Sequence, residues 1–316
     1  MTLKLASLCS GYGGLDLAVE SHFRNKGEEV ETVWFAENDK KCSQVLAHHW
    51  GDVPNYGDVT AIDWNSVPLC DILAAGYPCQ PFSHAGERRG EEDERAIFEY
   101  IAEGISTLRP EWVVLENVAG HLTLGGTSVT GSLASMGYDM RWGIVRASDT
   151  GSPHKRARWF CLATYSRGQR HGERENDRGM GDSSSQVESE AQQQRSRQEP
   201  EHRVGETQTP TNSTSMGLKD VREVSGLEEE IREPRTFNSF GPYEPAIRRW
   251  EQVLGRVAPD PTDELGVSPR FLEWMMGLPD GWVCDAGLES RTAELKMLGN
   301  GVVPIQGELA LRLLDD

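Results

Sequence analysis

The sequence has no paired or clustered metal ligands. Its six cysteines, at positions 9, 42, 70, 79, 161 and 284, are scattered, with no Cys-x-x-Cys pair and no Cys/His cluster. This spacing argues against a structural zinc site and for a reducing compartment. The chain also lacks an apolar run long enough to cross a bilayer and the basic and apolar segments of a signal peptide. We therefore expect a cytoplasmic protein with no bound metal and no membrane partner.

Positive charge is scarce in this chain. Lys and Arg together number 32 against 50 Asp and Glu, and the formal net charge is −18. A protein that coats nucleic acid needs a surplus of cations, so this balance counts against that class. Contact with DNA through a local basic strip is still compatible with it, and residues 141–158 contain five Lys or Arg with only Asp149 opposing them. A solvated charged face explains the strip equally well.

Apolar residues are nearly missing between positions 165 and 216. Such a segment cannot bury enough surface to offset its conformational entropy, so we expect a disordered insertion at about 168–212. The insertion divides the chain into residues 1–165, a variable region at 166–267, and a closing segment at 268–316.

The first 165 residues alternate apolar β-type runs with helix-like stretches, which predicts an α/β fold with a doubly wound, mostly parallel, Rossmann-like sheet. The expected strands carry apolar residues on both parities, as in a sheet covered on both faces. The strands are expected at 4–8, 31–36, 72–74, 112–115, 140–145 and 159–163. Helices are expected at 15–24, 40–48, 97–108, 131–136, 245–257, 270–276 and 306–314, with a loop between the last two.

A glycine-rich turn follows the first expected strand. Residues 10–14 read Ser-Gly-Tyr-Gly-Gly, and Leu15 begins the next helix. Glycines let a nucleotide-like ligand approach a helix N-terminus, although a plain tight turn would look the same. Glu37 ends the second strand, where a carboxylate can accept hydrogen bonds from ribose hydroxyls, and Asp58 could read an adenine amino group. Because no Lys or Arg stands in the turn, we expect an adenosine without a large diphosphate.

The segment 76–83 reads Gly-Tyr-Pro-Cys-Gln-Pro-Phe-Ser and follows a short apolar run. Pro78 and Pro81 restrict the backbone on both sides of Cys79, so the thiol is held on a stiff, extended turn. A nucleophile needs such a mount because its sulfur must meet a substrate atom at a set distance and angle. Taken alone, a buried thiol in a tight turn is an equally good interpretation.

Glu116 follows the apolar run 112–115 and is expected at the carboxyl end of a buried strand, where open α/β sheets place their sites. Partial desolvation there would raise the pKa of its carboxyl and let it donate a proton. A helix cap or an ion-paired Glu is the alternative for this residue alone.

Taken in order, these segments resemble the motifs of the DNA (cytosine-5)-methyltransferases over nearly the whole chain, except for the polar insertion. The turn at 10–14 resembles the S-adenosylmethionine loop, 78–80 the catalytic loop, and 116–118 the acidic catalytic motif. Residues 153–158 resemble the basic motif, and 298–303 the closing cofactor motif.

This resemblance implies the site residues. Catalytic roles would belong to Cys79, Glu116, Arg156 and Arg158. The cofactor, S-adenosyl-L-methionine, would contact Ser10, Gly11, Tyr12, Gly13, Gly14, Leu15, Glu37, Asn38, Asp58, Val59, Gly76, Pro78, Asn300 and Val302. The substrate would contact Gln80, Ser83, Asn117, Arg248 and Arg249, with Tyr243 and Trp250 either beside them or in the core of a small domain.

The implied reaction methylates C5 of a flipped-out cytosine in a specific DNA sequence through a covalent bond between Cys79 and C6. Arg156 and Arg158 would hold the O2 atom of the base and Glu116, and the loop at 80–93 would close as a lid. Residues 1–165 would then be the catalytic and cofactor domain, 166–267 the target-recognition region, and 268–316 a return to the catalytic domain. Double-stranded DNA is the expected partner, and we expect a monomer.

Three positions depart from the family pattern. Cys9 stands where an aromatic residue usually stacks on the adenine, His154 where the basic motif usually starts with Gln, and Gly301 where the closing motif usually has Ser. None affects Cys79 or Glu116, so we expect activity, with cofactor affinity the property that these changes affect.

Other functions fit parts of the pattern. An RNA (tRNA) cytosine-5 methyltransferase uses the same motifs, a catalytically silent DNA-binding homologue would lack Cys79 or Glu116, and a dinucleotide-dependent oxidoreductase gives the cysteine loop no role. The small size, with no regulatory domain before Leu5, favours a bacterial or phage enzyme of restriction-modification type. The recognition sequence, and whether a cognate restriction endonuclease exists, do not follow from the sequence.

Overall fold

The computed structural model describes residues 2–78, 90–121, 126–165 and 240–316. The predicted insertion at 168–212 lies outside these ranges, as do most of the proposed target-recognition region and residues 79–89. Three predicted site residues, Cys79, Gln80 and Ser83, are therefore outside the described part of the chain.

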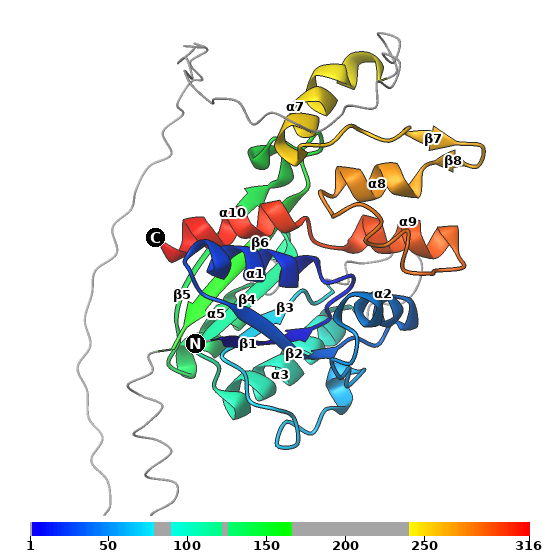
Figure 1. The fold of residues 1–316 in the computed structure, drawn as a ribbon. Helices are drawn as coiled ribbons and strands as arrows, with labels where there is room; N and C mark the ends of the chain where they lie inside the picture. Colours follow the sequence, from blue (N-terminus) through cyan, green and yellow to red (C-terminus); the bar gives the residue numbers. More distant parts are fainter. Residues whose placement is uncertain (1, 79–89, 122–125, 166–239) are drawn as a thin grey trace, which may run out of the picture. The chain divides into compact units, whose positions relative to one another are not determined.

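A six-stranded sheet forms the centre of the fold, in the order β2-β1-β3-β4-β6-β5 (Figure 1). Neighbouring strands pair in parallel from β2 to β4, while β6 runs antiparallel to both β4 and β5. The predicted doubly wound, mostly parallel α/β sheet is therefore confirmed. The strands are β1 Leu3–Leu8, β2 Val30–Ala36, β3 Ile72–Ala75, β4 Trp112–Val118, β5 Asp139–Arg146 and β6 Ala157–Thr164.

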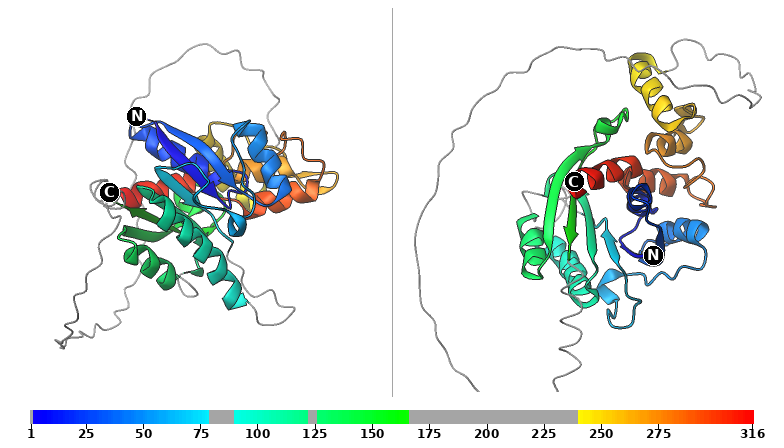
Figure 2. Two further views of the ribbon diagram at one scale, coloured as in Figure 1. Left: turned by 90° about the horizontal axis from the view of Figure 1, so that it is seen from below. Right: turned by 60° about the vertical axis from the view of Figure 1, so that its left-hand side comes forward.

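Both faces of this sheet are buried because successive side chains of a strand point to opposite faces. Leu73, Leu115 and Trp159 belong to the cluster that includes helices α3 (Gly90–Leu108) and α5 (Gly126–Ser135). Their neighbours Ile72, Val114 and Phe160 belong to the cluster that includes α1 (Gly14–Asn25) and α10 (Pro304–Asp315). Figure 2 shows the two helix pairs on opposite sides of the sheet.

The remaining α-helices and strands fall into two groups in the sequence. One helix follows β2, and the other elements lie between β6 and α10. Trp250 is completely buried and donates from Nε1 to the carbonyl oxygen of Trp274, so of its two interpretations the core role is confirmed. These elements are α2 Lys40–Trp50, α7 Glu244–Leu254, β7 Thr262–Asp263, β8 Gly266–Val267, α8 Pro269–Met275 and α9 Arg291–Asn300. Among the described residues, no helix is both long and apolar enough to cross a membrane.

Two elements differ from the sequence prediction. Helix α9 occupies part of the expected loop, and the signal for it was Ser290, whose side chain accepts a hydrogen bond from the Ala293 N–H as an N-cap. Helix α3 begins at Gly90, so residues 90–93 of the predicted lid are helical. In both cases the first turn carries no apolar periodicity, and the hydrophobic pattern therefore misses it.

Candidate functional site

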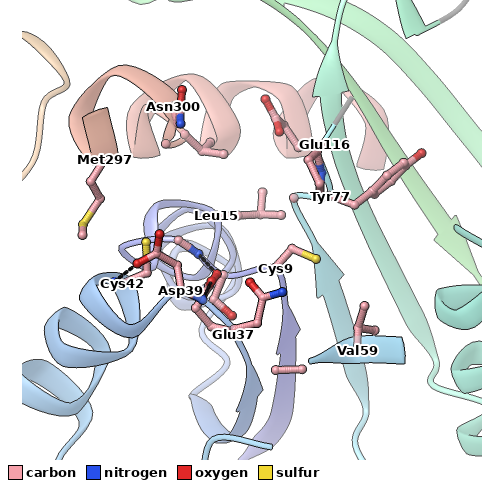
Figure 3. A pocket seen from close by; sticks show the side chains of 18 of the residues that line it. Cys9, Leu15, Glu37, Asp39, Cys42, Val59, Tyr77, Glu116, Met297 and Asn300 are labelled. Carbon is pink, nitrogen blue, oxygen red and sulfur yellow. Dashed lines mark hydrogen bonds between the residues drawn. The ribbon is translucent and has the colours of Figure 1, made fainter. Parts of the chain in front are cut away.

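A cavity of about 720 Å³ lies at the carboxyl ends of strands β1 to β4. The turn after β1, the ends of β2 and β4, the segment after β3, and helix α9 contribute to its walls (Figure 3). The predicted site residues that line it are Ser10, Gly11, Leu15, Glu37, Asn38, Asp58, Val59, Gly76, Pro78, Glu116, Asn117, Arg158, Asn300 and Val302.

Glu37 shapes the glycine turn as well as the cavity wall. Its two carboxylate oxygens accept from the Gly11 and Asp39 N–H groups, each at 2.8 Å. Burial raises the pKa of this carboxyl, and the two backbone bonds act in the opposite direction. Each oxygen keeps a further lone pair, so the carboxylate can accept from a ligand hydroxyl while it orders the turn.

Asp58 is held differently. It caps the short 3-10 helix Val59–Ala61, and its Oδ1 accepts from the backbone N–H and the hydroxyl of Thr60, at 2.9 and 2.8 Å. These bonds lower the pKa of its carboxyl. An ionised acceptor at this exposed rim is compatible with reading a ligand amino group.

Three residues predicted to bind the cofactor, Tyr12, Gly13 and Gly14, do not line the cavity. Tyr12 is buried, and its hydroxyl donates to the carbonyl oxygen of Val302 at 2.6 Å. A Cβ on Gly14 would collide with the same carbonyl oxygen. Helix α1 starts here, so Tyr12 and Gly14 pack against Val302 of the closing segment, while Gly13 lies against Trp50 and Leu46 of α2. Direct contact of these three residues with the cofactor stays a prediction.

The buried Glu116 and the half-buried Arg158 form an ion pair in the cavity wall. Arg158 Nε lies 3.1 Å from Glu116 Oε1. Burial raises the pKa of Glu116 to about 7, although the Arg158 and Arg156 cations lower it. Glu116 lies inside β4 rather than after it, since β4 continues to Val118 along β6, while its pairing with β3 stops at Leu115.

Arg156 does not line the cavity, and its side chain forms hydrogen bonds with the backbone of the closing motif. Its guanidinium donates to the carbonyl oxygens of Gly299 and Gly301, at 2.9 and 2.5 Å. The expectation that it reaches the O2 atom of a base is therefore not supported by its contacts. His154, at the first position of the basic motif, has its Nε2 3.1 Å from the carbonyl oxygen of Met275.

Several lining residues were missed by sequence reasoning. Lys41 and Cys42 belong to the first turn of α2, next to Glu37, and that proximity could have identified them. Tyr77 precedes Pro78 and was overlooked beside Cys79. The residues of α9 could not be found without predicting that helix. The missed residues are Ala36, Asp39, Lys41, Cys42, Gly57, Tyr77, Ile97, Val118, Ala293, Lys296, Met297, Gly299 and Gly301, in addition to Cys9.

The two arginines predicted to contact substrate lie on α7, away from the cavity. Arg248 forms ion pairs with Glu244 and Glu251, at 2.6 and 2.8 Å. Arg249 donates from Nε to the carbonyl oxygen of Gly151 at 3.3 Å. Within the described ranges, no group of three or more His, Cys, Asp or Glu residues could hold a metal ion.

Comparison with known proteins relates the chain to one family. The family model for C-5 cytosine-specific DNA methylases matches residues 3–308. The type II methyltransferase M.NlaIV of Neisseria lactamica is 33% identical over 174 residues, covering 51% of this chain and 41% of the relative. M.NgoBI of Neisseria gonorrhoeae is 38% identical over 164 residues, covering 50% of each. The alignments thus span about half of this chain and at most half of either relative.

A likeness in fold extends further than these alignments. The crystal structure of the S. pombe Dnmt2 methyltransferase matches 98% of this chain and 99% of its own, with a TM-score of 0.57 and 16% sequence identity. At this identity the match concerns the fold alone.

Proposed function

The chain belongs to the C-5 cytosine-specific DNA methylase family, and we propose that it transfers a methyl group from S-adenosylmethionine to C5 of a flipped-out cytosine in double-stranded DNA. The observation that carries the proposal is the ion pair between the buried Glu116 and Arg158, which shares the cavity wall with Gly76, Tyr77 and Pro78, the residues that lead into Cys79. The family pattern needs this carboxyl and this thiol at one site.

The described residues fit the cofactor. Gly11 has a left-handed φ of 59° and open space where a Cβ would be, so its backbone can approach a ligand closely. Glu37 and Asp58 supply acceptors for ribose hydroxyls and an adenine amino group. When bound, S-adenosylmethionine supplies an electrophilic methyl carbon on a sulfonium.

The residues of this chain then divide the remaining work. The Cys79 thiolate adds to C6 of the cytosine while Glu116 gives a proton or a hydrogen bond to N3, so that electron density moves to C5. A carboxyl with a pKa of about 7 is still partly protonated at neutral pH. Arg158 holds Glu116 in place.

Apart from a base for the C5 proton, the methyl transfer needs no further reactant. C5 forms a bond to the methyl carbon as the carbon–sulfur bond breaks, and its electron pair remains on sulfur. A base then takes the C5 proton, the double bond between C5 and C6 re-forms, and Cys79 leaves as a thiolate. Any proton that Glu116 gave to N3 returns to its carboxylate in this step. Because a stacked base cannot be reached in this way, the target must be flipped out of the duplex.

We assign sequence recognition to the region 166–267, with Arg248 and Arg249 on α7 as its DNA contacts, and 268–316 to the catalytic domain. The carboxylates beside Arg248 would have to release it to a phosphate or a guanine edge. Exchange of 166–267 with a relative's region should move the methylated site. An unchanged site would place recognition elsewhere. We expect a monomer in the bacterial cytoplasm, with or without a cognate restriction endonuclease.

The proposed function is tested by incubating tritiated S-adenosylmethionine with duplex DNA or with tRNA, followed by nucleoside analysis. We expect 5-methylcytosine in DNA and none in tRNA, and the reverse would assign the RNA substrate. Cys79→Ser should abolish the transfer, because a serine alkoxide is far harder to form at neutral pH. DNA with 5-fluorocytosine at the target should trap the enzyme covalently on Cys79 and on no other cysteine. An adduct elsewhere would refute the mechanism.

A further inference from the structure

Behind the cavity wall, two buried side chains form a polar contact that the proposed mechanism does not use. The hydroxyl of Tyr77 lies 2.9 Å from Nε2 of His121, and both residues are buried. Their rings meet edge to face at 83°, with centroids 5.5 Å apart. Tyr77 also lines the cavity, so one of its faces belongs to the site and its hydroxyl to the interior.

The contact joins the segments that follow β3 and β4, at a point where these two strands are no longer paired with each other. The parallel ladder between β3 and β4 ends at the pair Ala75 and Leu115. Beyond it, the chain after β3 continues through Tyr77 toward Cys79, while β4 continues through Glu116 toward His121. The hydrogen bond between Tyr77 and His121 is therefore a side-chain link between the segment that carries the proposed nucleophile and the segment that carries the proposed acid.

Packing fixes both rings. The His121 ring lies 5.0 Å from that of Trp159, a fully buried residue of β6. The Tyr77 ring lies 5.8 Å from that of Phe98 in α3. Since Tyr77 precedes residues 79–89 and α3 follows them, this contact joins the two sides of that segment.

The buried imidazole of His121 relies on the hydrogen bond with Tyr77 to satisfy its Nε2 atom. Burial lowers the pKa of His121, so the ring is neutral near pH 7. Its Nδ1 is buried with no hydrogen-bond partner among the described residues. Loss of the Tyr77 hydroxyl would leave a buried polar ring without its Nε2 bond, which is costly in an apolar setting.

We propose that Tyr77 and His121 are positioning residues, whose hydrogen bond sets the location of the Cys79 segment relative to Glu116. This inference rests on the proposed function, since it assigns the pair a role in methyl transfer. The bond crosses from one strand end to the next at the place where the two reacting groups must be held at a set distance. It acts through Cys79 and Glu116 and does not itself touch the cytosine.

The test uses the full chain and three variants, Tyr77→Phe, His121→Phe and the double variant, with Tyr138→Phe as a matched control. Tyr138 is also buried, and its hydroxyl donates to the carbonyl oxygen of Pro110 at 2.7 Å, but it does not line the cavity. Either single change should slow single-turnover methyl transfer by about tenfold, with the S-adenosylmethionine Kd changed less than about twofold. The double variant should be no slower than the slower single variant.

A second measurement does not need activity. The Gly76 N–H donates to the carbonyl oxygen of Leu8 at 3.3 Å, so hydrogen exchange of that amide reports on the start of the cysteine segment. Tyr77→Phe should speed its exchange by at least about fivefold, and Tyr138→Phe should not. In His121→Gln, the side-chain amide can take the place of Nε2 as the partner of Tyr77. This variant should therefore keep the methyl-transfer rate and the exchange rate of the Gly76 amide near their wild-type values.

The outcomes separate the inference from the proposed function. If Tyr77→Phe only lowers the melting temperature, as Tyr138→Phe does, with unchanged transfer rate and exchange, the positioning role is refuted. Should the wild-type protein methylate neither DNA nor tRNA, the proposed function fails. The exchange data then still decide whether the bond holds the Cys79 segment.

Discussion

The ring of Tyr12 occupies the space that a side chain at position 301 would need. A Cβ placed on Gly301 would lie far closer to Cε1 of Tyr12 than any real carbon–carbon contact. The Tyr12 hydroxyl meanwhile donates to the neighbouring carbonyl oxygen of Val302. Gly301, where the family usually has Ser, is therefore matched to the large side chain of Tyr12 in the glycine turn. The two positions form one packing unit.

This unit predicts a specific pair of variants. Gly301→Ser alone should lower the free energy of unfolding by about 1–3 kcal/mol, because it overpacks the contact with Tyr12. In a Tyr12→Ala background, which is itself destabilised, Gly301→Ser should cost less than it does in the wild-type protein, because the space beside position 301 is open. Urea unfolding of both variants measures the effect. Gly299→Ala is the control, since a Cβ there meets nothing within 4 Å. Equal stability of Gly301→Ser and wild type would contradict the packing argument.

The ionised Glu116 carboxylate should lower the free energy of unfolding at neutral and alkaline pH. Its pKa is about 7 when folded and 4.5 ordinarily, so the folded chain binds this proton more tightly than the unfolded chain. The contribution of this group to stability is therefore highest below pH 4.5, falls as the pH rises toward 7, and is level above it. Glu116→Gln should raise the free energy of unfolding at pH 8 by about 1–3 kcal/mol while it severely reduces methyl transfer.

The advantage of Glu116→Gln should disappear below pH 4.5, where wild-type Glu116 is protonated in both states. Glu273→Gln is a control of opposite sign. That buried carboxylate accepts from the backbone N–H groups of Gly281, Val283 and Cys284 at 2.6 to 2.9 Å, so its replacement should destabilise the protein. Chemical denaturation from pH 4 to 8 compares the two variants. A Glu116→Gln protein less stable than wild type at pH 8 would show that the ion pair outweighs the burial.

The two arginines of the basic motif should separate binding from chemistry. Arg156→Ala removes the donors to Gly299 and Gly301 and should raise the S-adenosylmethionine Kd by about tenfold or more, since the closing segment loses its support. Arg158→Ala should instead slow methyl transfer, because Glu116 loses its ion pair and its pKa rises further. Calorimetry of cofactor binding and single-turnover rates measure the two effects. The assignment fails if their order is reversed.

Glu37 and Asp58, the two acids proposed to bind the adenosine part of the cofactor, should differ in their effect on the KM for S-adenosylmethionine. Glu37→Ala removes the acceptor for the Gly11 and Asp39 N–H groups as well as the proposed ribose contact, and should raise the KM for S-adenosylmethionine by about tenfold or more. Asp58→Ala should raise it less, since Oδ1 of Asp58 already serves Thr60. Saturated turnover should change little in either variant. Unchanged activity at limiting cofactor would make both acids structural caps.

Much of the fold and the inventory of the site could be predicted because the signals are local. Apolar residues on both parities specify strands covered on both faces, which is how Leu73 and Ile72 come to lie in different clusters. The carboxylates at the ends of β2 and β4 were found for the same reason, since strand ends in an open parallel sheet converge on one edge. Residues at these ends, such as Glu37 and Glu116, line the cavity as expected.

The partners of these side chains could not be predicted. Tyr12 and Val302 are 290 positions apart, and Arg156 lies 145 positions from Gly301. Both contacts exist because α10 packs beside α1 on one face of the sheet, which no local pattern specifies. Tyr77 and His121 meet only because β3 and β4 are neighbours in the sheet. The sequence by itself determined which residues are available for chemistry, whereas long-range packing decided which contact the site and which hold it together.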